Sequence, residues 1–363
     1  MKKLLLVGGG HAHLYVIKQL QRYTIPNVEV TLISPDCYQY YSGMMSGFIE
    51  GLYELYEIRI NLKDLAQRSQ INWVKDKVMA IHPNERKIVT GKGDLYDYDV
   101  ISFDIGSLTR GLELPRVSEF ATLIKPNYHF PDAITNTEVA EKIVIVGGGA
   151  AGIEISLALK ARRQKQGIRT EITLISSGEL LASENKRISR KIEKIILGKG
   201  IKLVKGETVQ EVQSRALFTS SNTRVVYDKL IWLTGPKAPG LFKESQLPTD
   251  EQGYLLVKDT LQVEKYPSIF GTGDCITLDN HRDLAKTGVY AVRQGPVLFN
   301  NILEFVNNSD KREYFRPQRH FIAILSTGNR QGFLIYRGRG YSGRWAWHLK
   351  KWIDRRFINK YQN

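Results

Sequence analysis

The most informative segment of the chain is residues 142–159, KIVIVGGGAAGIEISLAL. It begins with an apolar run typical of a buried strand and continues, after three glycines, into a helical pattern. Gly147, Gly149 and Gly152 satisfy the spacing G-x-G-x-x-G. Between a strand and a helix, such glycines allow a tight turn, a close approach to a pyrophosphate and close helix packing. The segment therefore predicts a dinucleotide site at a helix N-terminus, where free N–H groups and the helix dipole attract phosphates.

The same order of elements occurs at the start of the chain. Residues 3–7 form a short apolar strand, residues 8–10 are glycines, a helical pattern runs to Leu20, and residues 28–33 form the next strand. His13 stands where the third small residue is expected, so this turn departs from the pattern. It is either a second dinucleotide turn or an ordinary glycine-rich connection lined by histidines. The βαβ context favours the first interpretation, and the unit then occurs twice.

A third feature, SIFGTGD at residues 268–274, indicates a flavin. An apolar strand ends here at Asp274, close behind two glycines. Its carboxylate can accept hydrogen bonds from the hydroxyls of a ribityl chain, or it can cap the next helix. Together with the two glycine turns, this pattern favours FAD on the first turn and a nicotinamide dinucleotide on the second.

Two further apolar strands, residues 98–102 and 227–232, lead to Gly106 and Gly235. We expect them to return the chain between the units, so that the second unit is inserted in the first. The predicted fold class is α/β, with two Rossmann-like domains for FAD and NAD(P)H and a basic C-terminal α/β appendage. The expected FAD-binding domain covers residues 1–110 and 236–305, the NAD(P)H-binding domain residues 111–235, and the appendage residues 306–363.

Composition places the chain among soluble globular proteins. Its 363 residues are 42% apolar and 25% charged, which is ordinary for a protein of about two domains. The N-terminal apolar run is too short for a signal peptide or a membrane span. Cys37 and Cys275 are too few for a disulfide framework or a structural zinc site. We therefore expect a cytoplasmic protein without a metal site.

Positive charge is concentrated at the C-terminus. The net charge is +15, and residues 311–363 contain thirteen Lys and Arg against two acids. Residues 344–361 fit a helix with an apolar and a polar side. The expected apolar side is Trp345, Leu349, Trp352, Ile353 and Phe357, and Lys350, Lys351, Asp354 and Arg355 lie mostly opposite. This pattern favours a helix that lies in an anionic lipid interface on the cytoplasmic face of the cell membrane. The alternative is a helix packed on the FAD domain.

The sequence resembles the pyridine-nucleotide-dependent flavoproteins, and within them the type II NADH dehydrogenases. The resemblance covers nearly the whole chain. The stretches Gly8–His13, Tyr41–Gly47, Ser102–Ser107 and Lys286–Gly295 are most similar to the flavoprotein module that is sometimes fused to selenide, water dikinase. That fusion assigns no selenium chemistry to this chain.

The resemblance implies a set of cofactor contacts. Gly8, Gly10, His11 and Ala12 would meet the FAD pyrophosphate, Ser34, Pro35 and Asp36 the adenosine ribose, and Asp274 the ribityl chain. The other expected cofactor-binding residues are Ser42, Val78, Gly106, Gly147, Gly149, Ala150, Ala151, Gly152, Ser176, Gly235, Gly273, Thr287 and Gly288.

Two residues are expected beside the reacting rings. By the resemblance, Lys286 begins a helix aimed at the flavin pyrimidine ring, where a lysine and a helix N-terminus would stabilise reduced flavin. Glu154 would orient the nicotinamide carboxamide, because hydride passes directly from nicotinamide to flavin. The alternatives are a solvated lysine and an ion-paired surface glutamate.

The choice between NADH and NADPH stays open. An acid at the end of the strand after the second turn would bind the ribose 2′-hydroxyl and repel a phosphate. This chain has Ser176–Gly178 there, followed by Glu179. Lys186 and Arg187 lie further on and could meet a 2′-phosphate or form a solvated helix face.

The predicted function is an FAD-dependent NAD(P)H dehydrogenase that passes electrons to a quinone or a similar acceptor at the membrane surface. Type II enzymes carry two glutamines where this chain has Val289 and Arg293, with Gln294 adjacent, so the acceptor stays open. One alternative is a sulfide:quinone oxidoreductase-like enzyme, which Lys286–Gly288 suggests and the lack of a cysteine pair disfavours. Another is a flavin-binding interaction protein with a nucleic-acid-binding tail, although no specific nucleic-acid motif is found. A homodimer also stays open.

Overall fold

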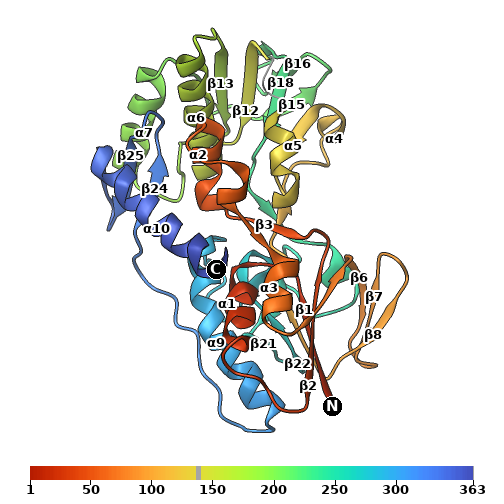
Figure 1. Ribbon diagram of the computed structural model, residues 1–363. Coiled ribbons are helices and arrows are strands. Elements are labelled where there is room, and N and C mark those ends of the chain that lie inside the picture. The colour runs from red at the N-terminus through yellow and green to blue at the C-terminus, as the bar shows by residue number, and fades with distance from the viewer. Residues whose placement is uncertain (136–139, 363) are drawn as a thin grey trace.

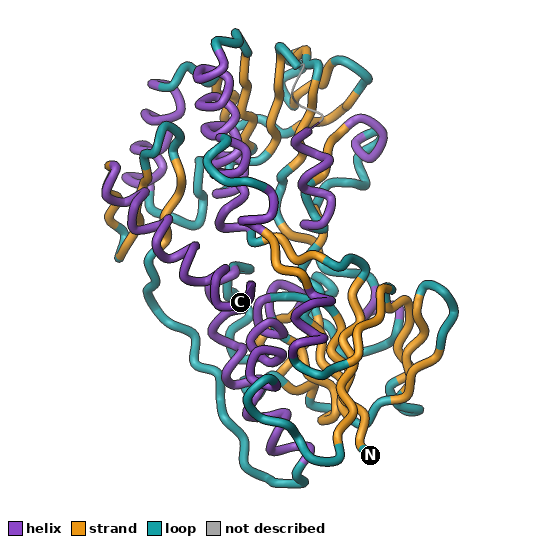
Figure 2. The backbone as a smooth tube through the Cα atoms, in the orientation of Figure 1, coloured by secondary structure: helices purple, strands orange, loops and turns teal. Residues whose placement is uncertain are grey.

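The computed structural model describes residues 1–135 and 140–362. Two β-sheets with flanking helices lie one above the other, and the C-terminal segment runs along one side of both (Figures 1 and 2).

The first sheet has the strand order β21-β22-β9-β1-β2-β5 and is parallel except for the β21–β22 pair. Its strands are β1 (Lys2–Val7), β2 (Val28–Ser34), β5 (Asn72–Lys75), β9 (Val100–Phe103), β21 (Gln262–Val263) and β22 (Tyr266–Gly271). The central strand β1 is apolar because both of its faces are covered, and residues 4–7 are buried. Helices α1 (His11–Leu20) and α9 (Gly288–Val306) lie side by side over this sheet (Figure 1).

The second sheet has the order β11-β18-β12-β13-β14 and is parallel throughout. Its strands are β11 (Ala121–Leu123), β12 (Lys142–Val146), β13 (Glu171–Ser176), β14 (Lys202–Lys205) and β18 (Lys229–Trp232). Helix α6 (Ala150–Gln166) follows the central strand, as α1 follows β1, and α7 (Lys186–Gly198) precedes β14. The two units are therefore built alike.

Each unit contains a small antiparallel sheet at the same place along the chain. The first is β6 (Val78–His82), β7 (Lys87–Thr90) and β8 (Leu95–Asp97), and the second is β15 (Val209–Val212), β16 (Ala216–Thr219) and β17 (Arg224–Val226). The chain crosses between the units at an antiparallel pair, β10 (Leu108–Thr109) with β19 (Pro236–Lys237). The second sheet is thus inserted between strands of the first.

The C-terminal segment joins the two units. It contains the antiparallel strands β24 (Ala323–Ser326), β25 (Gly332–Tyr336) and β26 (Arg339–Gly343), followed by helix α10 (Arg344–Gln362). Helix α10 begins beside the second unit and ends near α1 (Figure 1). Its end is fixed to the first unit, because Arg355 pairs with Glu57 at 2.9 Å and Arg68 donates to the Tyr361 carbonyl at 2.9 Å.

This architecture confirms the predicted α/β fold class, while the exact domain boundaries stay a prediction. The remaining helices are α2 (Ser42–Glu50), α3 (Leu62–Arg68), α4 (Val117–Phe120), α5 (Phe130–Thr135) and α8 (Leu241–Glu244), with the 3-10 turns η1 (Leu55–Ile58), η2 (Asn127–His129) and η3 (Gly273–Cys275). The remaining strands are β3 (Tyr38–Tyr40), β4 (Arg59–Asn61), β20 (Leu255–Val257) and β23 (Ile276–Leu278).

Helix α10 buries a face different from the one that its sequence suggests. Its buried residues are Ala346, Trp347, Asp354, Ile358 and Tyr361. Trp345, Trp352 and Ile353 of the expected apolar side are exposed, at 52%, 58% and 38%. Phe357, which was expected beside them, stacks on Tyr41 instead. The helix thus packs on the body and still presents an aromatic stripe to solvent. Among the described residues, no helix is both long and apolar enough to span a bilayer.

Candidate functional site

The two glycine turns occupy equivalent positions at the carboxyl ends of β1 and β12. Gly8 has φ +92°, and a Cβ there would lie 2.4 Å from the Asp104 carbonyl oxygen. Gly147 has φ +133°, and a Cβ there would lie 2.2 Å from the Leu233 carbonyl oxygen. Only glycine fits either position, because the next strand of the sheet passes directly beside the turn. Asp104 and Leu233 are therefore equivalent residues of the two units.

The second turn is open to solvent and fits a pyrophosphate. Gly149, Ala150 and Ala151 are exposed, and none of the other described residues comes within 4 Å of a Cβ placed on Gly149. Gly149 precedes the first turn of α6, and no side chain caps the helix there. A Cβ on Gly152 would lie 1.9 Å from the Gly147 carbonyl oxygen, so the third glycine allows the close packing that the motif predicts.

The first turn replaces that close packing with a hydrogen-bonded histidine. The His13 ring is buried, with Nδ1 2.7 Å from the Gly8 carbonyl oxygen and Nε2 2.8 Å from Ser102 Oγ. Burial lowers the pKa of His13 to about 4, so the ring is neutral near pH 7. His13, which replaces the third glycine of the pattern, thus links α1 by hydrogen bonds to Gly8 and to Ser102 of β9.

Acid is expected to destabilise the protein through this histidine. Because the folded state holds the pKa of His13 near 4, below its ordinary value of 6.5, its contribution is present above pH 6.5 and is lost as the pH falls through 4. The loss is about 3 kcal/mol. Urea unfolding at a series of pH values should show a shallower acid decline in His13→Gln than in the wild type. The exposed His348→Gln is the control, and an unchanged slope in His13→Gln would contradict the assignment.

Asp104 fills the space at the N-terminus of α1. The residue is 4% exposed, and its Oδ2 accepts hydrogen bonds from the backbone N–H groups of Ala12 at 2.8 Å and His13 at 3.1 Å. A Cβ on Gly10 would lie 2.1 Å from Asp104 Oδ1. The backbone of Gly8–His13 therefore fits a dinucleotide turn, but a carboxyl group already uses two of its N–H donors, those of Ala12 and His13. Sequence reasoning missed this residue, although an acid directly after four buried strand residues is a signal that could have found it.

The turn at residues 273–274 lies directly beside this group. A Cβ on Gly273 would lie 2.6 Å from Asp104 Oδ1, and the Gly273 N–H donates to Gln294 Oε1 at 2.7 Å. The Asp274 carboxylate lies 3.6 Å from Lys125 Nζ, which also donates to Ser107 at 2.7 Å. Gln294 of α9 thus holds the turn in place through this hydrogen bond. Asp274 lies within η3, and its side chain does not cap that helix.

His11 connects this turn to α9 and α10. Its ring lies 3.8 Å from a Cβ placed on Gly288, the first residue of α9, and 5.2 Å between centroids from Phe357. Desolvation lowers the pKa of His11 to about 4. Thr287 caps α9 by accepting from the Val289 N–H at 3.2 Å. The structure therefore brings together the expected residues at 8–12, 273–274 and 287–288.

The other expected contacts surround the first sheet. Ser34 Oγ donates to the Asp36 carbonyl at 2.8 Å, which fixes the exposed Pro35 between them at the end of β2. Val78 is buried in β6, and Ser42 is exposed at the start of α2. Gly106 and Gly235 both have positive φ, and the space where a Cβ would lie is open at each. The positions of these residues agree with a cofactor bound along the edge of the sheet, and their contacts with that cofactor stay predictions.

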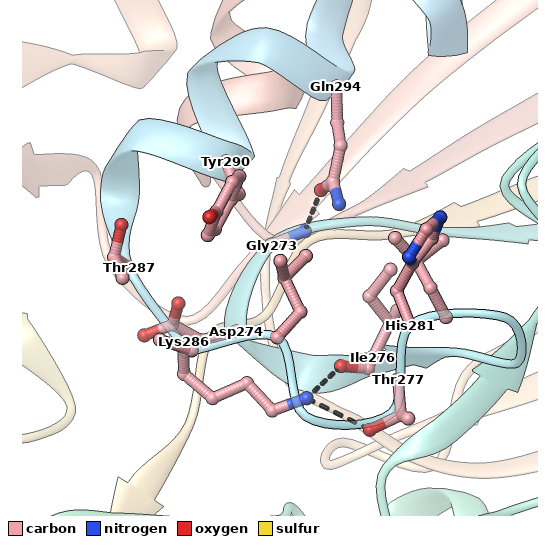
Figure 3. A pocket seen from close by; sticks show the side chains of 12 residues that line it. Gly273, Asp274, Ile276, Thr277, His281, Lys286, Thr287, Tyr290 and Gln294 are labelled. Carbon is pink, nitrogen blue, oxygen red and sulfur yellow. Dashed lines mark hydrogen bonds between the residues drawn. The ribbon is translucent and has the colours of Figure 1, made fainter. Parts of the chain in front are cut away.

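Lys286 lies half-buried just before α9. Its ammonium donates to the Ile276 carbonyl and to Thr277 Oγ1, the latter at 2.9 Å (Figure 3). It also lies 4.1 Å from the centroid of the Tyr254 ring. Partial burial lowers the pKa of Lys286. In this conformation the lysine fixes the loop before α9, so its expected role beside the flavin stays a prediction.

Glu154 lies where α6, α2 and β24 meet. Its Oε1 accepts from the Ser326 N–H at 2.7 Å and from Ser46 Oγ at 3.2 Å. Desolvation raises the pKa of Glu154, while the nearby ammonium of Lys350 opposes that rise. Glu154 is therefore a partly buried residue held by hydrogen bonds from α2 and β24, and its expected role beside the nicotinamide stays a prediction.

Lys350 and Asp354 form a buried ion pair that was expected on the polar side of α10. Their Nζ and Oδ2 atoms are 2.8 Å apart, and the side chains are 11% and 7% exposed. Lys350 Nζ also donates to the Gly43 carbonyl at 2.5 Å, and Tyr41 donates to Asp354 Oδ1 at 3.1 Å. The expectation differs from the structure because α2 supplies polar partners for this face. No pattern in the sequence indicates that contact.

The end of β13 is buried at Ser176, and the loop that follows it, residues 177–179, is exposed. Ser176 Oγ donates to the Gly178 carbonyl at 2.9 Å, and Gly178 has open space around it. The Glu179 carboxylate accepts from Ser189 at 3.0 Å and lies 3.5 Å from Lys205. Lys186 and Arg187 are exposed at the start of α7.

A groove opens between α1, α9 and α10, with about 460 Å³ of free space. Its lining includes the rings of Tyr15 and Phe357 and the cations Arg293 and Lys360.

Cys275 lies buried in η3. Burial raises the pKa of its thiol to about 12 and keeps the thiol protonated and unreactive. A sulfide-oxidising site built on this cysteine is therefore disfavoured.

The comparisons place this arrangement among known proteins. The profile of the family described as pyridine nucleotide-disulphide oxidoreductase matches residues 2–295. The type II NADH:quinone oxidoreductase of Staphylococcus saprophyticus is 23% identical over 388 aligned positions, which cover 99% of this chain and 96% of that protein. The structure of the sulfide:quinone oxidoreductase from Aquifex aeolicus covers 100% of this chain and 92% of its own, with a TM-score of 0.83 at 18% identity. The structure of NDH2 from Plasmodium falciparum in complex with NADH covers 99% and 97%, with a TM-score of 0.83 at 15% identity. Both structures share the fold of this chain.

Proposed function

This chain belongs to the pyridine nucleotide-disulphide oxidoreductase family, and we propose that it is an FAD-dependent NAD(P)H dehydrogenase that passes electrons to a quinone or a similar acceptor at a membrane surface. The observation that carries the proposal is the pair of equivalent glycine turns, each at the carboxyl edge of its own parallel sheet. Ligands of open α/β sheets bind at this edge. The name of the staphylococcal relative, type II NADH:quinone oxidoreductase, supports the quinone.

The chain divides the work between its two units. FAD, when bound, accepts hydride from the nicotinamide and gives up its electrons to the acceptor. Gly8–Ala12 and Asp274 hold the flavin dinucleotide, and Gly149–Gly152 hold the pyrophosphate of the nicotinamide dinucleotide. Glu154, on the helix that follows, orients the carboxamide. We assign residues 1–110 and 236–305 to the first unit, 111–235 to the second and 306–363 to the appendage.

The groove between α1, α9 and α10 is proposed as the acceptor site. A quinone ring is flat and gains negative charge on reduction. The rings of Tyr15 and Phe357 offer it apolar faces, and Arg293 and Lys360 offer it positive charge. Arg293 replaces a glutamine that type II enzymes are expected to carry, so the chain would stabilise the reduced acceptor with a cation.

The aromatic stripe of α10 is proposed to lie on anionic lipid. Trp345 and Trp352 are more than half exposed, and the cations Lys351 and Arg356 lie on the same helix. Aromatic rings beside Lys and Arg suit a lipid interface. The double variant Trp345→Ser and Trp352→Ser should lose at least about tenfold in binding to phosphatidylserine-containing vesicles. Sedimentation measures this, with NADH-dependent reduction of a soluble acceptor unchanged.

The control for the lipid experiment is Tyr23→Ser, which removes an exposed ring, 59% exposed, from a different surface. Equal vesicle binding by the tryptophan variant and the wild type would contradict the lipid proposal. Tighter binding of the wild type to a single-stranded oligonucleotide than to the vesicles would instead favour a tail that binds nucleic acid.

The function is tested on the purified protein by its flavin content and its turnover. We expect one FAD per chain after extraction, and steady-state reduction of a water-soluble quinone with NADH or NADPH as the donor. Comparing the two donors decides the preference that Ser176–Glu179 leaves open. A protein that retains no flavin, or that retains it and reduces no quinone with either donor, would contradict the proposal.

A further inference from the structure

We propose that Asp104 takes up a proton when the FAD pyrophosphate binds at the N-terminus of α1, so that FAD binding is coupled to proton uptake. The inference rests on the proposed FAD site and concerns the control of cofactor loading by this one side chain.

The carboxyl group of Asp104 lies between the two turns that would hold FAD. It accepts from Ala12 and His13, and a Cβ on either Gly10 or Gly273 would collide with its Oδ1, at 2.1 and 2.6 Å. The N–H groups at the start of a helix are the donors that a pyrophosphate uses. An ionised Asp104 and a pyrophosphate therefore compete for the same donors at close range.

The second unit shows that the fold does not require an acid here. Val7 pairs with Phe103 just before Asp104, and Val146 pairs with Trp232 just before Leu233. Leu233 is an apolar residue beside a turn whose helix N-terminus is open. Of the two equivalent positions, only the one beside the first turn carries an acid, so its charge is one difference between the two dinucleotide sites.

The surroundings of Asp104 offer little to neutralise a negative charge. The titratable groups of this cluster are His11 and His13 on α1, Asp274 and Cys275 in η3, and the cations Lys125 and Lys286. Both histidines are neutral near pH 7, and Lys125 and Lys286 are engaged with Asp274 and with the 276–277 loop. Burial, with the charge of Asp274 acting in the same direction, raises the pKa of Asp104 to about 7. A pyrophosphate dianion beside it raises that pKa further.

The linkage has a definite sign. The free protein loses the proton of Asp104 as the pH rises through about 7, and the complex keeps it. FAD affinity should therefore be constant below about pH 6.5 and fall by up to tenfold per pH unit above about pH 7.5. A protonated carboxyl group can also donate a hydrogen bond to a phosphate oxygen, which an ionised one cannot.

The test is FAD release from the holoprotein on dilution, followed by flavin fluorescence between about pH 6 and pH 8.5. The wild type should bind FAD more weakly at the alkaline end, and Asp104→Asn should bind it with nearly constant affinity. Mixing FAD with the flavin-free chain in a weak buffer with a pH indicator should take up close to one proton per FAD at about pH 8. If Asp104→Asn does not fold, the same measurements are made on Asp104→Leu, which introduces the residue found at the equivalent position of the second unit, Leu233.

The outcomes separate the two proposals. No FAD binding by the wild type at any pH would overturn the proposed function and this inference together. FAD binding with a constant affinity and no proton uptake would overturn the inference alone. A pH dependence that is unchanged in Asp104→Asn would also overturn it, because another group would then carry the proton. NADH binding at the second turn is the internal control and should not follow the FAD profile.

Discussion

Replacing Gly149 by valine is expected to lower kcat/KM for NADH strongly, while the protein stays folded and keeps its bound flavin. Gly149 has φ −79° and ψ 179°, an extended conformation that valine adopts readily, and no atom of residues 1–135 or 140–362 lies within 4 Å of the new Cβ, its own chain neighbours aside. The side chain would instead enter the space proposed for the pyrophosphate. We expect kcat/KM for NADH to fall at least about 100-fold, roughly 3 kcal/mol of lost binding.

Gly198→Val is the matched control, because Gly198 also has open space and lies at the end of a helix, α7, of the same unit. It should keep the wild-type kcat/KM, FAD content and melting temperature. Wild-type kcat/KM in Gly149→Val would mean that the nicotinamide dinucleotide does not bind on the second turn.

Replacing Lys350 by methionine is expected to destabilise the protein by about 3–5 kcal/mol, because it leaves a buried carboxylate without its partner. Lys350 Nζ lies 2.8 Å from Asp354 Oδ2, in contact with the Gly43 carbonyl and near Glu154. Methionine preserves much of the side-chain volume and removes the charge together with the hydrogen bonds that the ammonium donates. Thermal or urea unfolding measures the change, and protease cleavage within α10 should become faster.

Lys351→Met is the control on the same helix, since Lys351 lies beside the ring of Trp347 and forms no buried ion pair among the described residues. The double variant Lys350→Met and Asp354→Leu should recover much of the stability, because neither member of the pair then stays buried alone. Equal unfolding midpoints for Lys350→Met and Lys351→Met would contradict a role for the ion pair.

The local parts of the fold could be predicted from sequence, and the contacts between distant segments could not. The turns at Gly8 and Gly147 are predictable because each is defined by neighbouring residues. The role of Asp104 depends on a helix 92 residues earlier in the chain. Ser326 meets Glu154 across 172 residues. A single sequence can mark such a residue as a candidate, as the acid after a buried strand does for Asp104, but it does not show which distant segment the residue contacts.

Helix α10 illustrates the same limit. Its length and amphipathic character follow from its residues, but the face that it buries follows from its partners. Tyr41 and Gly43 of the first unit bind a polar pair, Lys350 and Asp354, that periodicity places toward water. Because hydrogen bonds and opposite charge can satisfy buried polar groups, polarity alone does not identify the exposed face.

The central claim is most directly tested by anaerobic rapid mixing of the flavoprotein with NADH and with NADPH, followed by mixing with a water-soluble quinone. We expect fast bleaching of the flavin absorbance by at least one donor and rapid return of that absorbance when the quinone is added. If neither nucleotide reduces the flavin, the chain is not an NAD(P)H dehydrogenase. If the flavin is reduced but the quinone does not reoxidise it, the dehydrogenase stands and the acceptor proposed for the α1–α9–α10 groove is wrong.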